Sequence, residues 1–354
     1  MIHVGLVGCG RIADLHYAGY ADNPDAMLYA VCDADAEVAQ ARSAAWHTPK
    51  CYVDFRELLA DPNIDAVEIV TPQTVHESMV IAAAEAGKHI AVQKPMTIGL
   101  DEADRMIAAT RKAGVTYKVT DNYPFYPPIA FAKRLIDDGV IGEPTMLRMK
   151  FVGGKWEGGW EVPRDTWAWR RKEAEAGRGT QTFDHGHHMW STAWFLLGEI
   201  ERVTAWVDTT DEFIDCPAVI MWKYKAPRRY GVCDYSQATE LAIPTRYYSC
   251  DEWFEVTGSK GIILVRRCTG NILDGPAVSV FTSGGWAHHD VESDWAAGFR
   301  FALRNFIGAI KGAEEPLLTG EQGRGILRFA LALRRSSDER REVCLDEMDR
   351  TPSL

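Results

Sequence analysis

The sequence predicts two domains, an α/β domain with a parallel sheet followed by an α+β domain with antiparallel strands. The first third of the 354 residues alternates short apolar runs with helical patterns, as βαβ units do. This rhythm ends at Asn122, where an aromatic and proline-rich segment follows at residues 123–128. Several later runs alternate apolar and polar residues, as half-buried antiparallel strands do. We therefore expect domains at residues 1–122 and 123–354.

The elements of the first domain follow from these patterns in chain order. Parallel strands are expected at residues 2–7, 28–32, 66–70, 89–92 and 115–120. Helices are expected after Arg11 and at residues 36–45, 74–86 and 100–112.

The second domain is expected to begin with a helix that ends at Asp138 and Gly139. Strands should follow at residues 145–152, 203–207, 219–224, 230–235, 253–256, 262–265 and 342–345. Helical patterns occupy residues 184–197, 295–311 and 321–335. Residues 153–180 follow no regular pattern, and loops of that length are usually functional or mobile.

The charge and cysteine content limit the partners of the protein. The formal net charge of −11 is spread along the chain, which argues against nucleic acid and an anionic membrane surface. No apolar run reaches membrane-spanning length, and the first residues lack the features of a signal peptide. The eight cysteines are widely separated. We expect a cytoplasmic protein with a small-molecule partner.

A glycine turn near the N-terminus predicts a dinucleotide site. Gly8-x-Gly10-x-x-Ala13 follows a strand and opens a helix, so that backbone amides at the helix start can face a pyrophosphate. The next strand ends in Asp33, at the spacing expected for a carboxylate that binds the adenosine ribose. Ala34 follows instead of an arginine, which favours NAD over NADP.

Two further segments lie at the ends of predicted parallel strands, where ligands collect in open α/β sheets. They are residues 71–73 with His76, and residues 93–95. Lys94 follows an apolar strand and precedes a proline, which favours a functional role over a solvated surface lysine. For His76, capping or packing is the favoured interpretation.

An acid and a base lie four residues apart in the second domain. In a helix, Asp184 and His188 share one face, and a carboxylate close to an imidazole tunes it as a general base. His185 and His187 add two imidazoles, but a helix spreads the four groups over different faces. We therefore expect no metal site.

At this point the chain resembles the Gfo/Idh/MocA family of oxidoreductases over essentially its whole length. The resemblance rests on Gly8-Cys9-Gly10-Arg11-Ile12, Thr71-Pro72-Gln73-x-x-His76, Gln93-Lys94-Pro95, Asn122, Trp169-Arg170 and Asp184-x-x-x-His188. It implies a Rossmann domain, then a domain with a large, mostly antiparallel open sheet that often mediates dimers or tetramers, and a nicotinamide facing a substrate cleft.

The resemblance also implies roles for individual residues. Lys94, Asp184 and His188 occupy the catalytic positions. The cofactor NAD is expected to contact Gly8, Gly10, Arg11, Ile12, Asp33, Thr71, Pro72, His76, Gln93, Lys94, Asn122, Trp169 and Arg170. Two departures stand out: Gln93 replaces the family's usual glutamate before the lysine, and the polar residues 180–182, expected to reshape the substrate pocket, precede Phe183.

The tryptophans favour a carbohydrate or a cyclitol as substrate. Six of the twelve lie between Trp156 and Trp194, and indole faces stack on the C–H faces of sugar rings. Core packing is favoured for Trp190 and Trp194, which lie four residues apart. Substrate contacts are expected from Lys94, Trp156, Trp160, Arg164, Asp184, His185 and His188.

Three functions remain open at the level of sequence. The first is an NAD-dependent dehydrogenase in which His188 takes the hydroxyl proton and Lys94 stabilises the developing alkoxide. The second is a redox-neutral enzyme that cleaves glycosides through a transient keto-sugar. The third is an NAD-sensing regulator, which the presence of both Lys94 and His188 disfavours.

Overall fold

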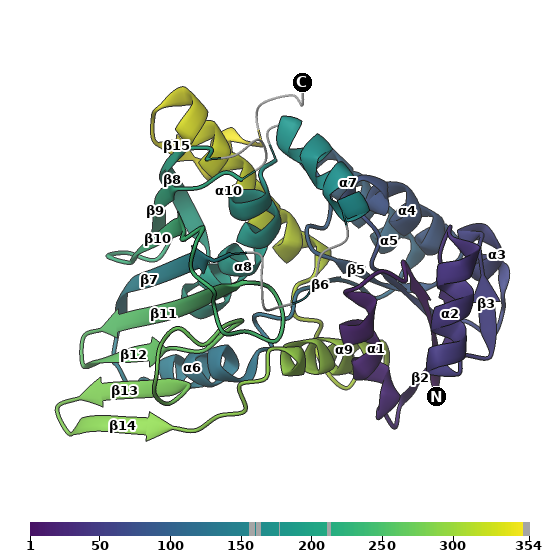
Figure 1. The fold of residues 1–354 in the computed structure, drawn as a ribbon, viewed down its shortest axis with the longest axis horizontal. Helices are drawn as coiled ribbons and strands as arrows, with labels where there is room; N and C mark the ends of the chain where they lie inside the picture. Colours follow the sequence, from purple (N-terminus) through teal and green to yellow (C-terminus); the bar gives the residue numbers. More distant parts are fainter. Residues whose placement is uncertain (156–159, 161–163, 177, 211–213, 350–354) are drawn as a thin grey trace. The chain divides into compact units, whose positions relative to one another are not determined.

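The computed structural model describes residues 1–155, 160, 164–176, 178–210 and 214–349 (Figure 1). The chain divides into two compact units. Among the described residues, the first contains Met1–Asn122 and Gly298–Leu327, and the second contains residues 123–297 and 328–349. Residues Gly298–Leu327, which we expected in the second domain, therefore cluster with the first.

A six-stranded parallel sheet forms the centre of the first unit, in the order β3-β2-β1-β4-β5-β6. Its strands are β1 (Ile2–Val7), β2 (Ala26–Cys32), β3 (Lys50–Tyr52), β4 (Ala66–Ile69), β5 (His89–Gln93) and β6 (Tyr117–Thr120). Its helices are α1 (Ala13–Ala21), α2 (Ala36–Trp46), α3 (Phe55–Ala60), α4 (His76–Glu85) and α5 (Leu100–Ala113). From β1 the chain continues to β2 and β3 on one side, and then crosses to β4, which lies on the other side of β1. Open α/β sheets bind ligands at such a switch point in strand order.

The helix α9 (Ala296–Ile310) completes the core of the first unit. Leu303 and Phe306 of α9 are buried in one cluster with Val4, Leu6 and Val31 of the sheet. Figure 1 shows α1 and α9 on one side of this sheet and α4 and α5 on the other. Because α9 supplies part of this core, the segment from residue 298 belongs with the first unit.

A nine-stranded sheet forms the second unit, in the order β14-β13-β12-β11-β7-β10-β9-β8-β15. Its strands are β7 (Pro144–Gly153), β8 (Ile200–Val207), β9 (Ala218–Tyr224), β10 (Tyr230–Gln237), β11 (Cys250–Gly258), β12 (Gly261–Val265), β13 (Val278–Thr282), β14 (Gly285–His289) and β15 (Val343–Cys344). Within the described part of this sheet, β7 and β10 pair in parallel and the other strand pairs are antiparallel. The predicted mostly antiparallel sheet is confirmed.

Helices cover one face of this sheet. They are α6 (Pro127–Asp137), α8 (Gly186–Leu197) and the later part of α10 (Gly320–Glu339). The indole of Trp190 on α8 contacts Trp222 of β9 and Phe329 of α10, with ring centroids 6.2 Å and 5.1 Å away. The predicted role of Trp190 in core packing agrees with these contacts. Among the described residues, we find no helix with the length and hydropathy of a membrane span.

Several elements were missed by the sequence patterns. Helix α7 (Arg164–Glu175) lies inside the stretch expected to be irregular. Its apolar residues are two tryptophans and two alanines among many charges, so no stripe with helical period is visible. The strands β13 and β14 were also missed, as were the short elements β3 and α3. In β14 the sequence Gly-Trp-Ala-His-His lacks the β-branched residues that mark a strand.

Candidate active site

The glycine turn between β1 and α1 has the conformation that the sequence motif requires. Gly8 has φ +93°, and a Cβ on it would lie 2.9 Å from the carbonyl carbon of Val70. Only glycine fits this approach without strain. A Cβ on Gly10 would have nothing within 4 Å. Arg11 and Ile12 continue the turn into α1, whose start has no side-chain cap and can face an anion.

The carboxylate of Asp33 lies beside this turn. Its Oδ2 accepts a hydrogen bond from the backbone N–H of Cys9 at 2.7 Å, and its Oδ1 accepts one from Asp35 N–H at 3.0 Å. The turn and the end of β2 are thus fixed to each other. This arrangement fits an adenosine ribose held by Asp33 next to a pyrophosphate on the glycine turn.

His76 links the loops that follow β4 and β5. Its Nε2 lies 2.8 Å from the carbonyl oxygen of Thr71, and its Nδ1 lies 3.1 Å and 3.2 Å from those of Pro95 and Met96. Burial lowers the pKa of His76 to about 4, although the carbonyls oppose this shift. His76 therefore fixes the loop that contains Lys94, which agrees with the packing interpretation.

Lys94 is positioned by its backbone. Its N–H donates to Thr120 O at 3.1 Å and to the side-chain Oε1 of Gln93 at 3.0 Å. The side-chain amide of Gln93 thus accepts a hydrogen bond from the backbone of Lys94, whose ammonium group we expect to take part in catalysis. The carboxylate oxygen of a glutamate could accept the same hydrogen bond. Glutamine in place of the family's usual glutamate therefore preserves this contact and removes a negative charge.

Asn122 follows β6 and is fully buried. Within the described part of the chain, neither its Nδ2 nor its Oδ1 has a hydrogen-bond partner, and Thr120 Oγ1 also has none. A buried polar group without a partner costs about 1–3 kcal/mol, so such groups call for a ligand or another explanation. These unsatisfied atoms fit a polar group of a bound cofactor at the carboxyl end of the sheet.

In the second unit, a short π-helix (Thr180–His185) leads into α8. Asp215 holds its beginning, because this buried carboxylate accepts the N–H groups of Gln181 at 2.7 Å and Thr182 at 2.9 Å. The Thr182 hydroxyl also donates to Asp215, and Trp190 Nε1 donates to Thr182 O at 3.0 Å. The polar residues before Phe183 therefore anchor the segment that presents Asp184. π-helical turns of this kind are frequent at functional sites.

The expected base His188 is buried against an aromatic ring. The ring of Tyr123 stacks on its imidazole, with centroids 4.4 Å apart and an interplanar angle of 15°. The carboxylate of Asp184 forms an ion pair with Arg170, with Oδ2 and Nε 3.6 Å apart. Arg170 was expected near the cofactor, and the structure gives it this carboxylate as a partner.

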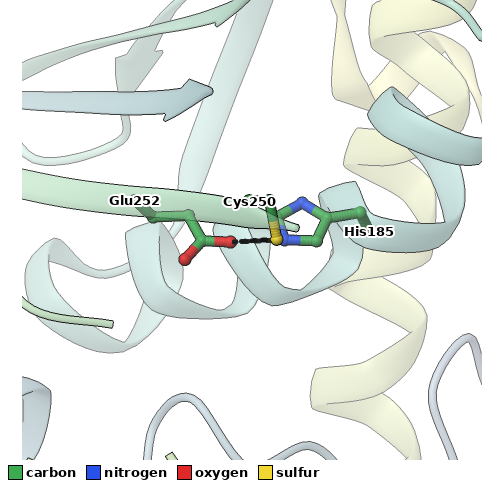
Figure 2. A group of neighbouring side chains, drawn as sticks. All are labelled: His185, Cys250 and Glu252. Atoms are coloured by element: carbon green, nitrogen blue, oxygen red, sulfur yellow. Dashed lines mark hydrogen bonds and ion pairs between the residues drawn. The ribbon is translucent and has the colours of Figure 1, made fainter. Parts of the chain in front are cut away.

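His185 belongs to a cluster that the sequence did not reveal (Figure 2). Its Nε2 lies 2.8 Å from Oε1 of the fully buried Glu252, and the Cys250 thiol donates to the same oxygen at 3.7 Å. Burial opposes ionisation of Glu252, yet the hydrogen bond and charge of His185 hold the pKa of this carboxyl below its usual value. The predicted strand began at residue 253, three residues late, so Cys250 and Glu252 fell outside it.

The remaining expected residues have varied outcomes. His187 is buried, with Nδ1 2.6 Å from the carbonyl oxygen of Phe183, so it packs apart from His185. Trp160 contacts the rings of Tyr247 and Tyr248, with centroids 5.3 Å and 5.7 Å away. Trp156 lies outside the described residues, as do the side chains of Arg164 and Trp169 on α7.

Comparison with known proteins shows the family to which the chain belongs. Residues 2–121 match the model of an oxidoreductase family with an NAD-binding Rossmann fold. Residues 129–264 match the model of the GFO/IDH/MocA C-terminal domain. The chain therefore belongs to the Gfo/Idh/MocA family of oxidoreductases, as the motifs predicted, and NAD is its cofactor.

Individual relatives extend over nearly the full chain. Myo-inositol 2-dehydrogenase of Thermotoga maritima is 29% identical over 357 residues, which cover 98% of this chain and 99% of that protein. D-apiose dehydrogenase of Paraburkholderia graminis is 27% identical over 354 residues, with 97% and 90% covered. The crystal structure of a probable dehydrogenase from Thermotoga maritima has a TM-score of 0.80 at 28% identity, covering 98% of this chain and all of that one.

Proposed function

We propose that the protein is an NAD-dependent dehydrogenase that transfers a hydride between a secondary hydroxyl of a sugar, cyclitol or sugar derivative and nicotinamide. The observation that carries this proposal is the buried imidazole of His188, stacked on Tyr123, in a chain with an NAD-binding domain. The relatives named for myo-inositol and D-apiose support a polyhydroxylated substrate.

Each proposed catalytic residue has a separate task. His188 takes the proton of the substrate hydroxyl, and Lys94 stabilises the negative charge that develops on that oxygen. Asp184, paired with Arg170, orients His188 or accepts a hydrogen bond from the substrate. Bound NAD accepts the hydride or returns it.

The cofactor would be held by groups of the first unit. The turn at Gly8 and Gly10 would take the pyrophosphate and Asp33 the ribose. The unsatisfied amide of Asn122 would contact a polar group of the cofactor. The half-buried rings of Trp160 and Tyr248 offer a surface for a sugar ring in the second unit.

We also propose that the protein is a homodimer or homotetramer that associates through the exposed face of the nine-stranded sheet. Exposed apolar side chains on its strands are Trp206, Val219, Met221, Tyr230, Phe281 and Trp286. Large apolar side chains that gather on an exposed face mark interaction sites. A cytoplasmic location is part of the same proposal, since the eight cysteines are free thiols, as cytosolic proteins usually keep them.

The first test incubates the purified protein and NAD with a panel of sugars, cyclitols, sugar acids and glycosides. NADH absorbance and released free sugar are both recorded. NADH formed from an unglycosylated substrate is the expected result. Free sugar released from a glycoside without NADH would contradict the proposal and support the redox-neutral reaction through a transient keto-sugar.

The second test removes the proposed catalytic groups. We expect His188→Ala to lower kcat by about 10²–10⁴-fold, the usual contribution of a general base. Lys94→Ala should lower kcat by about 10²–10³-fold, as the loss of one oxyanion contact does. Lys112→Ala, on the exposed surface of α5, is the matched control and should retain wild-type turnover. Near wild-type rates in both catalytic variants would refute the assigned roles.

A further inference from the structure

Three side chains with metal-ligating atoms converge in the second unit. The Nε2 or Nδ1 of His185, the Sγ of Cys250 and a carboxylate oxygen of Glu252 all lie within 4.8 Å of one another (Figure 2). Cys250 and Glu252 are two residues apart on β11, so their side chains leave the strand on the same face. His185 reaches them from the end of the π-helix.

The spacing of these atoms is close to that of a tetrahedral zinc site. Zinc bonds of about 2.0–2.3 Å place neighbouring ligand atoms about 3.3–3.6 Å apart. The His185 Nε2 to Glu252 Oε1 distance is 2.8 Å, and the Cys250 Sγ to Glu252 Oε1 distance is 3.7 Å. Shifts of about half an ångström would admit an ion, and side-chain rotations provide them.

The groups around the cluster resemble the outer shell of a metal site. The hydroxyl of Tyr235 lies 3.4 Å from Nδ1 of His185, so it can fix the ring with Nε2 directed at Glu252. The backbone N–H of Thr269 donates to Glu252 Oε2 at 3.2 Å, which leaves Oε1 on the side of His185 and Cys250. Metal-binding histidines and carboxylates are usually oriented by contacts of this kind.

We propose that His185, Cys250 and Glu252 bind one divalent transition-metal ion of the zinc class. An imidazole, a thiolate and a carboxylate together favour zinc over magnesium or calcium, which prefer oxygen ligands. Cys250 loses its proton to the solvent on binding. The described residues of the cluster supply three ligands, so a water or a ligand oxygen takes the fourth position.

This site lies beside the proposed base. The rings of His185 and His188 are 5.7 Å apart between centroids. A cation held by His185 would therefore act on the electrostatics of His188 and of an oxygen bound next to it. The binding proposal itself does not depend on the dehydrogenase reaction.

The test measures metal directly in the tag-free, full-length protein. After treatment with a chelator, the protein is equilibrated with Zn²⁺ or Co²⁺, desalted and analysed by elemental mass spectrometry. We expect about one ion per chain, and for Co²⁺ a thiolate-to-metal charge-transfer band with the visible bands of tetrahedral cobalt. A folded protein that takes up no stoichiometric ion, or a Co²⁺ complex without the charge-transfer band, would overturn the proposal.

Variants assign the ion to this cluster. We expect Cys250→Ser and Glu252→Gln each to weaken Zn²⁺ binding at least about tenfold, with circular dichroism to verify folding. Cys51→Ser is the matched control, because this thiol is exposed and lies in the first unit. Binding that persists unchanged in both cluster variants would locate the ion elsewhere and refute the site. If either variant fails to fold, the cobalt spectrum of the wild type still decides.

Discussion

His76 shows how one buried imidazole can make stability depend on pH. The unfolded chain binds a proton on this residue below its ordinary pKa of 6.5, whereas burial lowers the pKa of the folded ring to about 4. Between these values the unfolded state carries more protons, so lowering the pH favours unfolding. The contribution of His76 is complete above pH 6.5 and is lost as the pH falls toward 4.

This difference predicts a measurable loss of stability. From pH 7.5 to pH 5, the free energy of unfolding of the wild type should fall by about 2 kcal/mol more than that of His76→Gln, which cannot titrate. Urea unfolding at a series of pH values measures both proteins. Parallel curves for the two would show that this ring does not titrate as its burial requires.

The residues around His188 show which side-chain contacts could not be predicted from the sequence. Asp184 and His188 were recognisable from their spacing and from the family pattern. Tyr123, which stacks on His188, lies 65 positions earlier in the chain, and no local pattern connects the two. Glu252 was equally hidden, because a buried carboxylate on a strand is paired only after the fold brings His185 to it.

Helices α1 and α9 of the first unit pack closely at Gly19, which has no side chain. Gly19 lies in the buried part of α1, and a Cβ on it would be 2.4 Å from Cδ1 of Leu303 on α9. This contact explains why α9, far along the chain, belongs with the N-terminal residues. It also explains a glycine in the interior of a helix, where this residue is otherwise unfavourable.

Gly19→Ala should therefore destabilise the protein by about 1–3 kcal/mol, because the added methyl group forces Leu303 or the helix to move. Gly325→Ala on α10 is the control, since a Cβ there meets nothing within 4 Å. We expect the control to be neutral or to stabilise by up to about 1 kcal/mol, as alanine does in helices. Thermal unfolding compares the two, and equal effects would show that α1 and α9 are not in close contact.

Elements differ in how well the sequence predicted them. Five of the six parallel strands were found because they are short apolar runs between helical patterns, and Gly8, Gly10 and Asp33 marked the turn. Helix α7 was missed because its sequence shows no apolar stripe with helical period, and β14 because its sequence lacks β-branched residues. In β13, Val278 and Val280 alternate and are buried, but the strand is only five residues long. Residues 298–327 belong to the first unit because they pack against residues far away in the sequence. Hydrophobic periodicity does not predict such long-range contacts.

At the scale of the whole molecule, one face of the sheet of the second unit exposes apolar side chains near both of its ends, with the ion pairs Lys150–Asp234 and Arg148–Glu255 on the central strands between them. In the strand register, Trp206 of β8 lies opposite Val219 of β9, and Phe281 of β13 lies opposite Trp286 of β14. Met221 is two residues beyond Val219 and shares its face. These side chains are exposed in the single chain, so apolar surface extends over strands at both ends of the sheet.

An association of subunits through this face predicts that charge will disrupt it. The double variant Trp206→Glu with Met221→Glu should change the dimer or tetramer into monomers, because burying unpaired carboxylates costs several kcal/mol. Each 1.4 kcal/mol weakens association about tenfold, so the effect should be visible by light scattering at micromolar concentration. Val53→Glu, at an exposed position in the first unit, should leave the mass unchanged. A monomeric wild type, or a double variant that keeps the wild-type mass, would show that this face is not the interface between subunits.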